Sequence, residues 1–230
     1  MTAHGLVVGV FAASVLLSGC VATVSGTAVR DGHAVPTDVP PLDEAALKRV
    51  LLPIDEVNGI MGTKNLEVTS EIDDMTDSSS KVSDPDCLGA MFGAEEKVYD
   101  GSGWTAVHDW VAREPEEDNE HWVEQTAVLY PDAAHANNFF QKSKSTWQKC
   151  AGTSLAVDDS NSSSLWEISD LTAQDGLLTQ VATQEDVDGW GCQHALSVVS
   201  NMTVETWACA YRPGDEAATM AIDIVTNAAR

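Results

Sequence analysis

Residues 192–211, CQHALSVVSNMTVETWACAY, decide the fold of this 230-residue chain. Two runs rich in β-branched and aromatic residues, 192–199 and 202–211, flank the pair Ser200-Asn201, a pattern that predicts an antiparallel hairpin. Asn201 is expected to supply the positive φ that such a tight turn requires. A turn centred on this pair places Cys192 directly opposite Cys209.

Other segments predict further strands and helices on either side of this hairpin. Strands are expected at 65–72, 104–113, 122–130, 165–171 and 176–183, and helices at 42–52, 55–61, 132–152 and 215–229. Residues 73–86 are rich in Asp and Ser without periodicity, so we expect a mobile loop there. Strands joined by turns and accompanied by helices indicate an α+β class, a single mixed α/β domain with an antiparallel sheet flanked by helices.

The N-terminus has the features of an export signal. The apolar run 6–17 is shorter than the roughly 20 residues that span a bilayer, but it suits the core of a signal peptide. The Leu17-Ser18-Gly19-Cys20 tetrad that ends it resembles a bacterial lipobox. The resemblance implies that 1–19 is a lipoprotein signal peptide and that Cys20 becomes lipidated. An ordinary secretory peptide with a stray cysteine is the alternative.

The segment 20–41 is small, polar and Pro-punctuated, so it predicts a flexible tether before the domain at 42–230. We therefore expect a protein on the extracytoplasmic face of the cell membrane, attached to it through lipid on Cys20. Acyl chains anchor a protein stably when there are two or more.

Four cysteines follow Cys20, and an even number in an exported chain predicts two disulfides with three possible connectivities. The hairpin register selects Cys192–Cys209 and leaves Cys87 to pair with Cys150. Each bond is expected to stabilise the fold by roughly 3 to 4 kcal/mol.

The charge excludes some classes of partner. Twelve Lys and Arg against 36 Asp and Glu give a net charge of −24, which argues against nucleic-acid binding and against a basic patch for anionic lipid. Lys142, Lys144 and Lys149 gather on one predicted helix, as a solvated face or, alternatively, a local anion site.

Motifs for catalysis or metal binding do not emerge. Gly101-Ser102-Gly103 is not the G-x-S-x-G elbow of hydrolases. The histidines at 108, 121, 135 and 194 lack metal-ligand spacing. We expect no enzymatic activity, no metal and no cofactor.

A known family shares this arrangement. A helical start after a Pro-rich tether, the four spaced cysteines, strands that carry Trp104 and Trp110, and a helix with Trp147 resemble the family of PknH-like extracellular sensor domains from mycobacteria. The resemblance covers 42–230. It implies a mixed α/β domain with an antiparallel sheet, flanking helices and a cleft proposed to bind a ligand, and it brings no catalytic residues.

The seven tryptophans suggest where a ligand would bind. Alternation predicts Trp104, His108 and Trp110 on one face of their strand, and Trp122 with Glu124 on one face of the next. These five residues are our candidate ligand site, an aromatic groove with His108 and Glu124 as polar groups. A packed core is the alternative.

The leading hypothesis is a non-enzymatic, lipid-anchored binding or sensor-like domain that captures a small amphiphilic ligand or cell-envelope component. The first alternative is a protein-interaction module that docks a membrane partner through its acidic surface. The second is an unrecognised hydrolase, which requires a His–carboxylate pair beside a Ser in a pocket.

Overall fold

The computed structural model describes residues 35–115, 120–158, 162–174 and 176–230. The chain divides into two compact units, and the described residues belong to Gly32–Arg230. The predicted signal peptide, Cys20 and most of the predicted tether lie outside the described residues.

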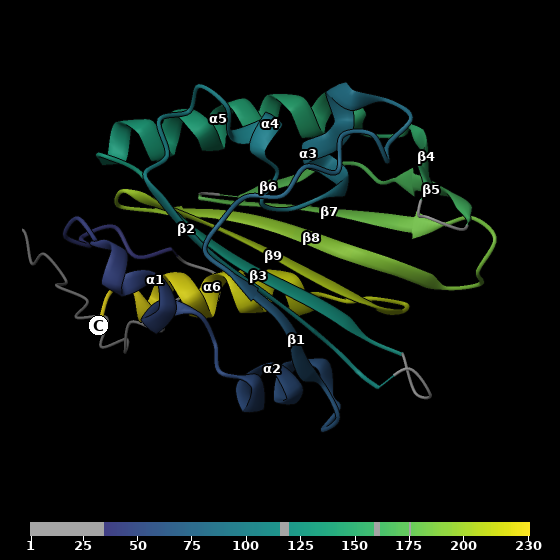
Figure 1. Cartoon of the computed structure of the whole chain (residues 1–230), viewed down its shortest axis with the longest axis horizontal. Coiled ribbons are helices and arrows are strands. Elements are labelled where there is room, and N and C mark those ends of the chain that lie inside the picture. Colours follow the sequence, from purple (N-terminus) through teal and green to yellow (C-terminus); the bar gives the residue numbers. More distant parts are fainter. Residues whose placement is uncertain (1–34, 116–119, 159–161, 175) are drawn as a thin grey trace, which may run out of the picture. The chain divides into compact units, whose positions relative to one another are not determined.

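A nine-stranded antiparallel sheet forms the centre of the domain (Figure 1). Its spatial order is β1-β2-β3-β9-β8-β7-β5-β4, and β6 pairs with β7 off this path. The strands are β1 Glu67–Ile72, β2 Ala106–Arg113, β3 Trp122–Leu129, β4 Ser154–Asp158, β5 Ser163–Ile168, β6 Thr172–Gln174, β7 Leu177–Gln184, β8 Trp190–Val199 and β9 Met202–Tyr211. The prediction of an α+β domain around an antiparallel sheet is confirmed.

The β8–β9 hairpin has the predicted register, with Cys192 opposite Cys209. The prediction for the turn itself is corrected. Ser200, not Asn201, takes the positive φ of 50°. The buried Asn201 side chain instead accepts a hydrogen bond from the Leu42 backbone N–H and donates to the carbonyls of Leu42 and Tyr130. It thereby joins the start of the domain to the centre of the sheet.

Two disulfides form in the predicted connectivity, Cys192–Cys209 as a register pair and Cys87–Cys150 between the remaining cysteines. Cys87–Cys150 fastens the turn of 3-10 helix Pro85–Cys87 to the end of helix α5 (Ala133–Cys150), and Cys192–Cys209 bridges β8 and β9. Both link segments that already pack together, so they reinforce the sheet and one of its helical layers.

Helices cover both faces of the sheet, and each layer has its own apolar core (Figure 1). On one face lie α1 Glu44–Val50, α2 Ile54–Met61 and α6 Glu216–Asn227; on the other lie α3 Leu88–Met91, α4 Glu96–Tyr99 and α5 Ala133–Cys150. Asp132 caps α5 by accepting a hydrogen bond from the His135 backbone N–H, as expected of an N-cap. None of the helices in the described ranges is long and apolar enough to cross a membrane.

The segment between β1 and α3, expected to be a mobile loop, is held at several points. Thr76 bridges to Glu95 and Val82 bridges to Val157. The Ser78 backbone N–H also donates to the Glu95 carboxylate at 2.7 Å. These contacts hold the loop against the sheet layer, where it contributes to the cleft described below.

Candidate functional site

A set of polar side chains lies on the sheet face that α5 covers. The registers place Asp109 opposite Thr126 and Thr126 opposite Glu205, so these residues of β2, β3 and β9 point to the same side. Glu124 and Trp207 form the next pair on that side. Polar groups from three neighbouring strands therefore meet beneath the helical layer.

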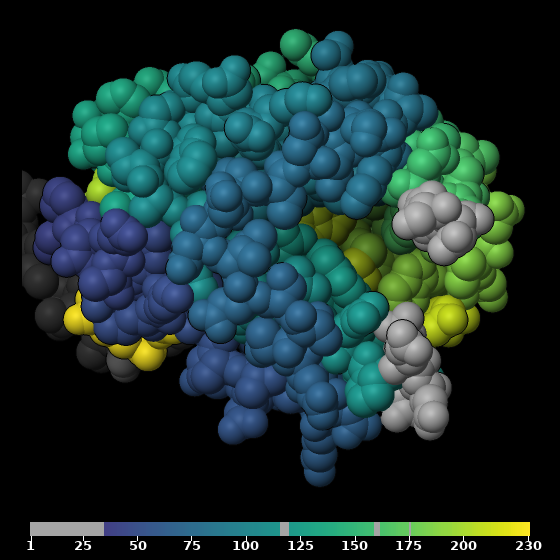
Figure 2. Space-filling model, in the orientation of Figure 1, coloured from purple at the N-terminus to yellow at the C-terminus, as the bar shows by residue number. Residues whose placement is uncertain are grey.

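Asp109, Glu124 and Trp207 line a cleft of about 350 Å³, hereafter the cleft, and Thr126 and Glu205 lie beside them on the same sheet face. Figure 2 shows the hollow, with the yellow-green surface of β8 and β9 visible between teal strands and the blue segment that precedes α4. Its lining combines strand, loop and helix residues: Ser70, Ile72, Thr76, Ser78, Lys81, Met91, Phe92, Gly93, Glu95, Asp109, Val111, Trp122, Glu124, Val157, Trp166, Cys192, Trp207 and Cys209.

Aromatic rings make up much of the wall. Trp122, Trp166 and Trp207 pack around the Cys192–Cys209 disulfide, and Phe92, the residue that follows α3, adds a further ring to the lining. A mostly apolar cavity with a few converging polar groups is the usual form of a small-molecule site.

Two of the acidic residues at the cleft are satisfied by the protein. Glu205 accepts hydrogen bonds from the Ala94 backbone N–H and the Tyr99 hydroxyl, both at 3.0 Å. Glu95 accepts from the Ser78 backbone N–H and the Thr76 hydroxyl. Burial raises the pKa of Glu95, and its bonds to Ser78 oppose that rise.

Next to Glu205 lies His194, whose ring is stacked on the Trp207 indole and tilted by 39° to the Trp147 indole. Its centroid is 4.0 Å from those of Trp147 and Trp207, and its Nε2 lies 3.6 Å from a Glu205 oxygen. Burial lowers the pKa of His194 and the nearby Glu205 opposes this. A neutral imidazole here supports the cleft base from within the core.

The other two carboxyl groups, those of Asp109 and Glu124, lie on neighbouring strands and both line the cleft, and the pKa of each is shifted by the other. Asp109 is buried and accepts a bond from the Thr126 hydroxyl at 2.6 Å. Burial raises the pKa of Asp109 to about 6, against the Thr126 bond. Burial, then the charges of Asp109 and Glu205, raise the pKa of Glu124 well above its usual range. Two adjacent carboxyl groups in such a site hold a proton between them.

Gly93 sits directly over Glu124. A Cβ at this position would lie 3.0 Å from Glu124 Oε1 and 3.3 Å from Trp207 Nε1. The Trp207 indole N–H is buried, and no hydrogen-bond acceptor in the described part of the chain contacts it. Because residue 93 is a glycine, no side chain at this position covers the Glu124 carboxyl group or the unpaired Trp207 indole N–H.

The structure separates the five predicted ligand residues. Trp122 and Glu124 line the cleft, but Trp110 lies opposite Gln125 and belongs to the core of the other sheet face. His108 shares that second face, because it lies two residues from Trp110 on β2. The prediction of one groove containing all five is corrected to a cleft containing two of them.

Trp104 precedes β2 and packs against the core beneath α5. The expectation that it shares a strand face with Trp110 is therefore also corrected. For Trp110 the structure supports the packed-core alternative, since its side chain is only 7% exposed.

The four domain histidines lie at separate places, each near a carboxylate: Asp73 for His108, Glu114 for His121, Asp132 for His135 and Glu205 for His194. The cavity beside His108 is lined by Glu44, Ala45, Leu47, Lys48, Asp73 and Val107, without a serine. The arrangement that the hydrolase alternative requires is not found at this pair. Within the described residues, no group of three or more His, Cys, Asp or Glu is placed to hold a metal ion.

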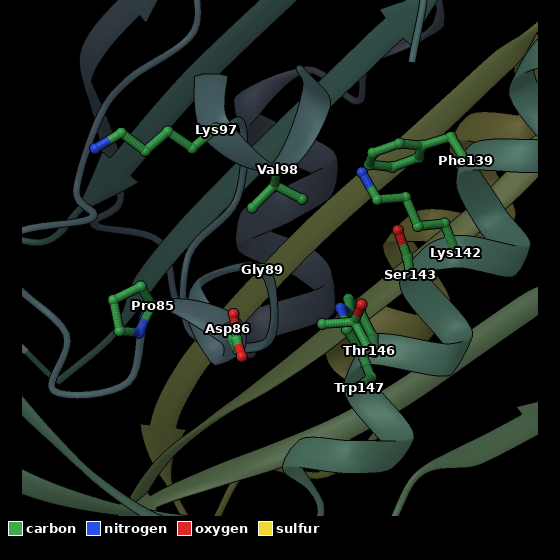
Figure 3. A pocket seen from close by; sticks show the side chains of 10 residues that line it. All are labelled: Pro85, Asp86, Gly89, Lys97, Val98, Phe139, Lys142, Ser143, Thr146 and Trp147. Atoms are coloured by element: carbon green, nitrogen blue, oxygen red, sulfur yellow. The ribbon is translucent and has the colours of Figure 1, made fainter. Parts of the chain in front are cut away.

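A smaller cavity of about 210 Å³ lies between α5 and the segment of α3 and α4 (Figure 3). Phe139 and Lys142 reach into it from α5 toward Val98, whereas Lys97 points away. Lys97 pairs with Asp77 at 3.4 Å, so its charge is already matched. The cleft is larger and brings together more functional groups, which makes it the stronger candidate site.

Known proteins are similar to this chain in sequence and in architecture. The family model of the PknH-like extracellular domain matches residues 42–229. The serine/threonine-protein kinase PknH of Mycobacterium tuberculosis is 37% identical over 185 residues, which are 80% of this chain and 30% of the kinase. The Mycobacterium bovis kinase PknH is 36% identical over 80% of this chain and 31% of its own length. A crystal structure of the extracellular domain of PknH from M. tuberculosis has a TM-score of 0.79 at 35% identity, covering 82% of this chain and 97% of that one.

Proposed function

Because the chain belongs to the PknH-like extracellular domain family, an extracytoplasmic and sensor-like group of domains, we propose that it binds a small amphiphilic ligand or envelope component in the cleft. Binding requires no chemical step on the ligand. The chain spans about 30% of the kinases it matches, and the match is to their extracellular domain.

The observation that carries this proposal is the composition of the cleft. A volume of about 350 Å³ suits a small molecule, and the tryptophan rings offer apolar contact while Glu124 and Asp109 offer polar contact. Indole rings contribute large contact areas at low conformational cost. The elements that hold the rings, β3, β9 and the Cys192–Cys209 bridge, form the centre of the sheet.

The test is ligand capture by the full chain from cell-envelope extracts, read by native mass spectrometry and by tryptophan fluorescence. Trp122→Ala should weaken binding about tenfold, equivalent to about 1.4 kcal/mol, because it removes one wall of the cleft. Trp104→Ala is the matched control, since Trp104 is also a partly buried tryptophan but packs against the core beneath α5 and does not line the cleft. Equal effects of the two variants, or no captured ligand, would contradict the proposal.

We also propose that Cys20 carries the membrane anchor, on the strength of the lipobox-like tetrad before it. Cys20→Ser should abolish incorporation of an alkyne-labelled fatty acid and release the protein from the membrane fraction. A membrane-bound Cys20→Ser protein would refute this part of the proposal.

A further inference from the structure

We propose that the cleft selects an organic ammonium ion that also carries an oxygen acceptor, that is, an amino alcohol such as choline or ethanolamine. Its cationic head would lie against Asp109 and Glu124, and its oxygen would accept from Trp207. This inference rests on the proposed function and specifies the class of ligand.

The first support is uncompensated negative charge. Glu95 and Glu205 each accept hydrogen bonds from two donors of the protein, whereas Asp109 accepts one from the Thr126 hydroxyl and Glu124 lies beside Asp109 in the lining. The ion pairs found between described residues include neither Asp109 nor Glu124. Lys81 is the basic residue of the lining, and it is exposed. A ligand cation would therefore meet a pair of carboxyl groups that lacks a counter-ion.

The second support comes from the walls. Faces of aromatic rings attract cations, tryptophan most strongly, and aromatic cages recognise quaternary ammonium groups. The cleft brings Trp122, Trp166 and Phe92 around the same space as the carboxyl pair. Negative charge at the base and rings at the sides favour an alkylated ammonium over an inorganic cation, which would require a shell of oxygen ligands.

The third support is the free Trp207 N–H, which would be satisfied by an oxygen acceptor on the ligand. Trp207 is 3% exposed, and its donor lacks a partner among the described residues. An unmade hydrogen bond of a buried donor is costly, so an acceptor from a ligand would be favourable there. Gly93 permits this approach, because a Cβ would stand 3.3 Å from the indole nitrogen and 3.0 Å from the Glu124 carboxyl.

A cation at this pair competes with the proton that the pair holds, so binding should depend on pH. The titratable or charged groups around the pair are Glu205 on β9, His194 on β8, Glu95 and Tyr99 at α4, and Lys81 in the preceding loop. His108 is next to Asp109 on β2 but lies on the other face of the sheet, and its charge lowers the pKa of Asp109. Burial raises the pKa of Asp109 to about 6. Deprotonation above that pH restores the charge that attracts an ammonium ion, and protonation below it removes the charge.

Choline is the probe, because its charge does not change with pH, and 3,3-dimethylbutan-1-ol is its neutral isostere. Titration calorimetry on the full chain should show choline binding that strengthens about tenfold between pH 5 and pH 7, as expected for displacement of one proton. The isostere should bind at least about tenfold more weakly than choline at pH 7. Equal binding of the two probes, or choline binding independent of pH, would overturn the inference.

Asp109→Asn should weaken choline binding about tenfold or more and flatten its pH dependence, because Asp109 is the group whose ionisation supplies the charge. Asp170→Asn, the same substitution at an exposed position outside the cleft lining, should leave both unchanged. If Asp109→Asn alters stability, the ratio of choline to isostere affinity within the variant still reports the preference for charge. A variant that retains the wild-type ratio would contradict the assignment.

Two further comparisons ask whether the ammonium group comes from a lipid headgroup or from a free molecule, and whether a failure concerns the ammonium preference alone or ligand binding in the cleft as a whole. Phosphatidylcholine vesicles, compared with phosphatidylglycerol vesicles, test whether the same ammonium group is taken from a lipid headgroup or only free in solution; binding in either form supports the inference. A chain that binds neutral envelope amphiphiles in the cleft but not choline would refute the ammonium preference and leave the proposed function standing. A chain that binds neither would refute both.

Discussion

Asp109→Asn should make the folded domain more stable at neutral pH. In the folded state burial raises the pKa of Asp109 from 3.8 to about 6, so ionising this group within the fold is unfavourable. A rise of about two units corresponds to about 3 kcal/mol lost at neutral pH relative to a neutral side chain. The asparagine carbonyl oxygen can still accept the bond that the Thr126 hydroxyl donates to Asp109.

The sign of the pH dependence follows from proton binding. Between about pH 4 and pH 6 the folded state binds the proton more tightly than the unfolded state, so the wild-type domain gains stability from this group as the pH falls. The advantage of Asp109→Asn should therefore be greatest, up to about 3 kcal/mol, at pH 7.5 and should nearly vanish at pH 4. Urea unfolding of both proteins across this range measures the difference.

Asp170→Asn is the control, because Asp170 is an exposed residue and its substitution also removes one negative charge. It should change the free energy of unfolding by less than about 0.5 kcal/mol at either pH. A stabilisation by Asp109→Asn that does not change with pH, or a destabilisation at pH 7.5, would refute the electrostatic reasoning.

Three other substitutions test the remaining structural claims. Asn201→Ala should destabilise the domain by about 2 to 4 kcal/mol in denaturant unfolding, because it leaves buried backbone groups without their partner; an effect below 1 kcal/mol would contradict that role. Loss of the Cys87–Cys150 bond through paired alanine substitutions should cost about 4 kcal/mol, since the bond closes a 63-residue separation; an unchanged unfolding midpoint would contradict this. Gly93→Ala should reduce ligand binding at least about tenfold while the far-UV circular dichroism is unchanged, because its Cβ would crowd Glu124; full binding would show that the ligand lies elsewhere.

The sequence predicted the parts of the fold that depend on local periodicity and on symmetry about a turn. The Cys192–Cys209 pairing follows from the two runs around Ser200-Asn201, and the structure has that register. The short strands β4 and β6 escaped prediction, because five and three residues give too little alternation to recognise.

The candidate site was less predictable because it depends on register between strands. The alternation of side chains shows which residues of one strand share a face. It does not show which residues of β2 lie on the same side of the sheet as which residues of β3. The symmetry argument that succeeds for β8 and β9 pairs Trp110 with Gln125 and Val111 with Glu124 when it is applied to β2 and β3. A signal that separates Trp110 from Glu124 is thus present in the sequence.

Other parts of the cleft leave no local trace in the sequence. Asp109 looks like an ordinary polar residue of an alternating strand, and Glu205 lies among Thr and Val residues of β9. Their proximity arises only when β3 inserts between β2 and β9. Gly93 becomes informative only when the positions of Glu124 and Trp207 are known.

The buried acids of the cleft and the Cys192–Cys209 disulfide beside them have opposite effects on the stability of the fold. Asp109 and Glu124 disfavour folding at neutral pH because burial opposes their charge. The Cys192–Cys209 bridge lines the same cleft and limits the freedom of the unfolded chain. Strained or unfavourable groups persist where the surrounding structure determines their positions, and they concentrate at functional sites. A carboxyl pair buried beneath the helical layer on β2 and β3 is therefore better explained by a ligand that uses its charge than by a contribution to folding.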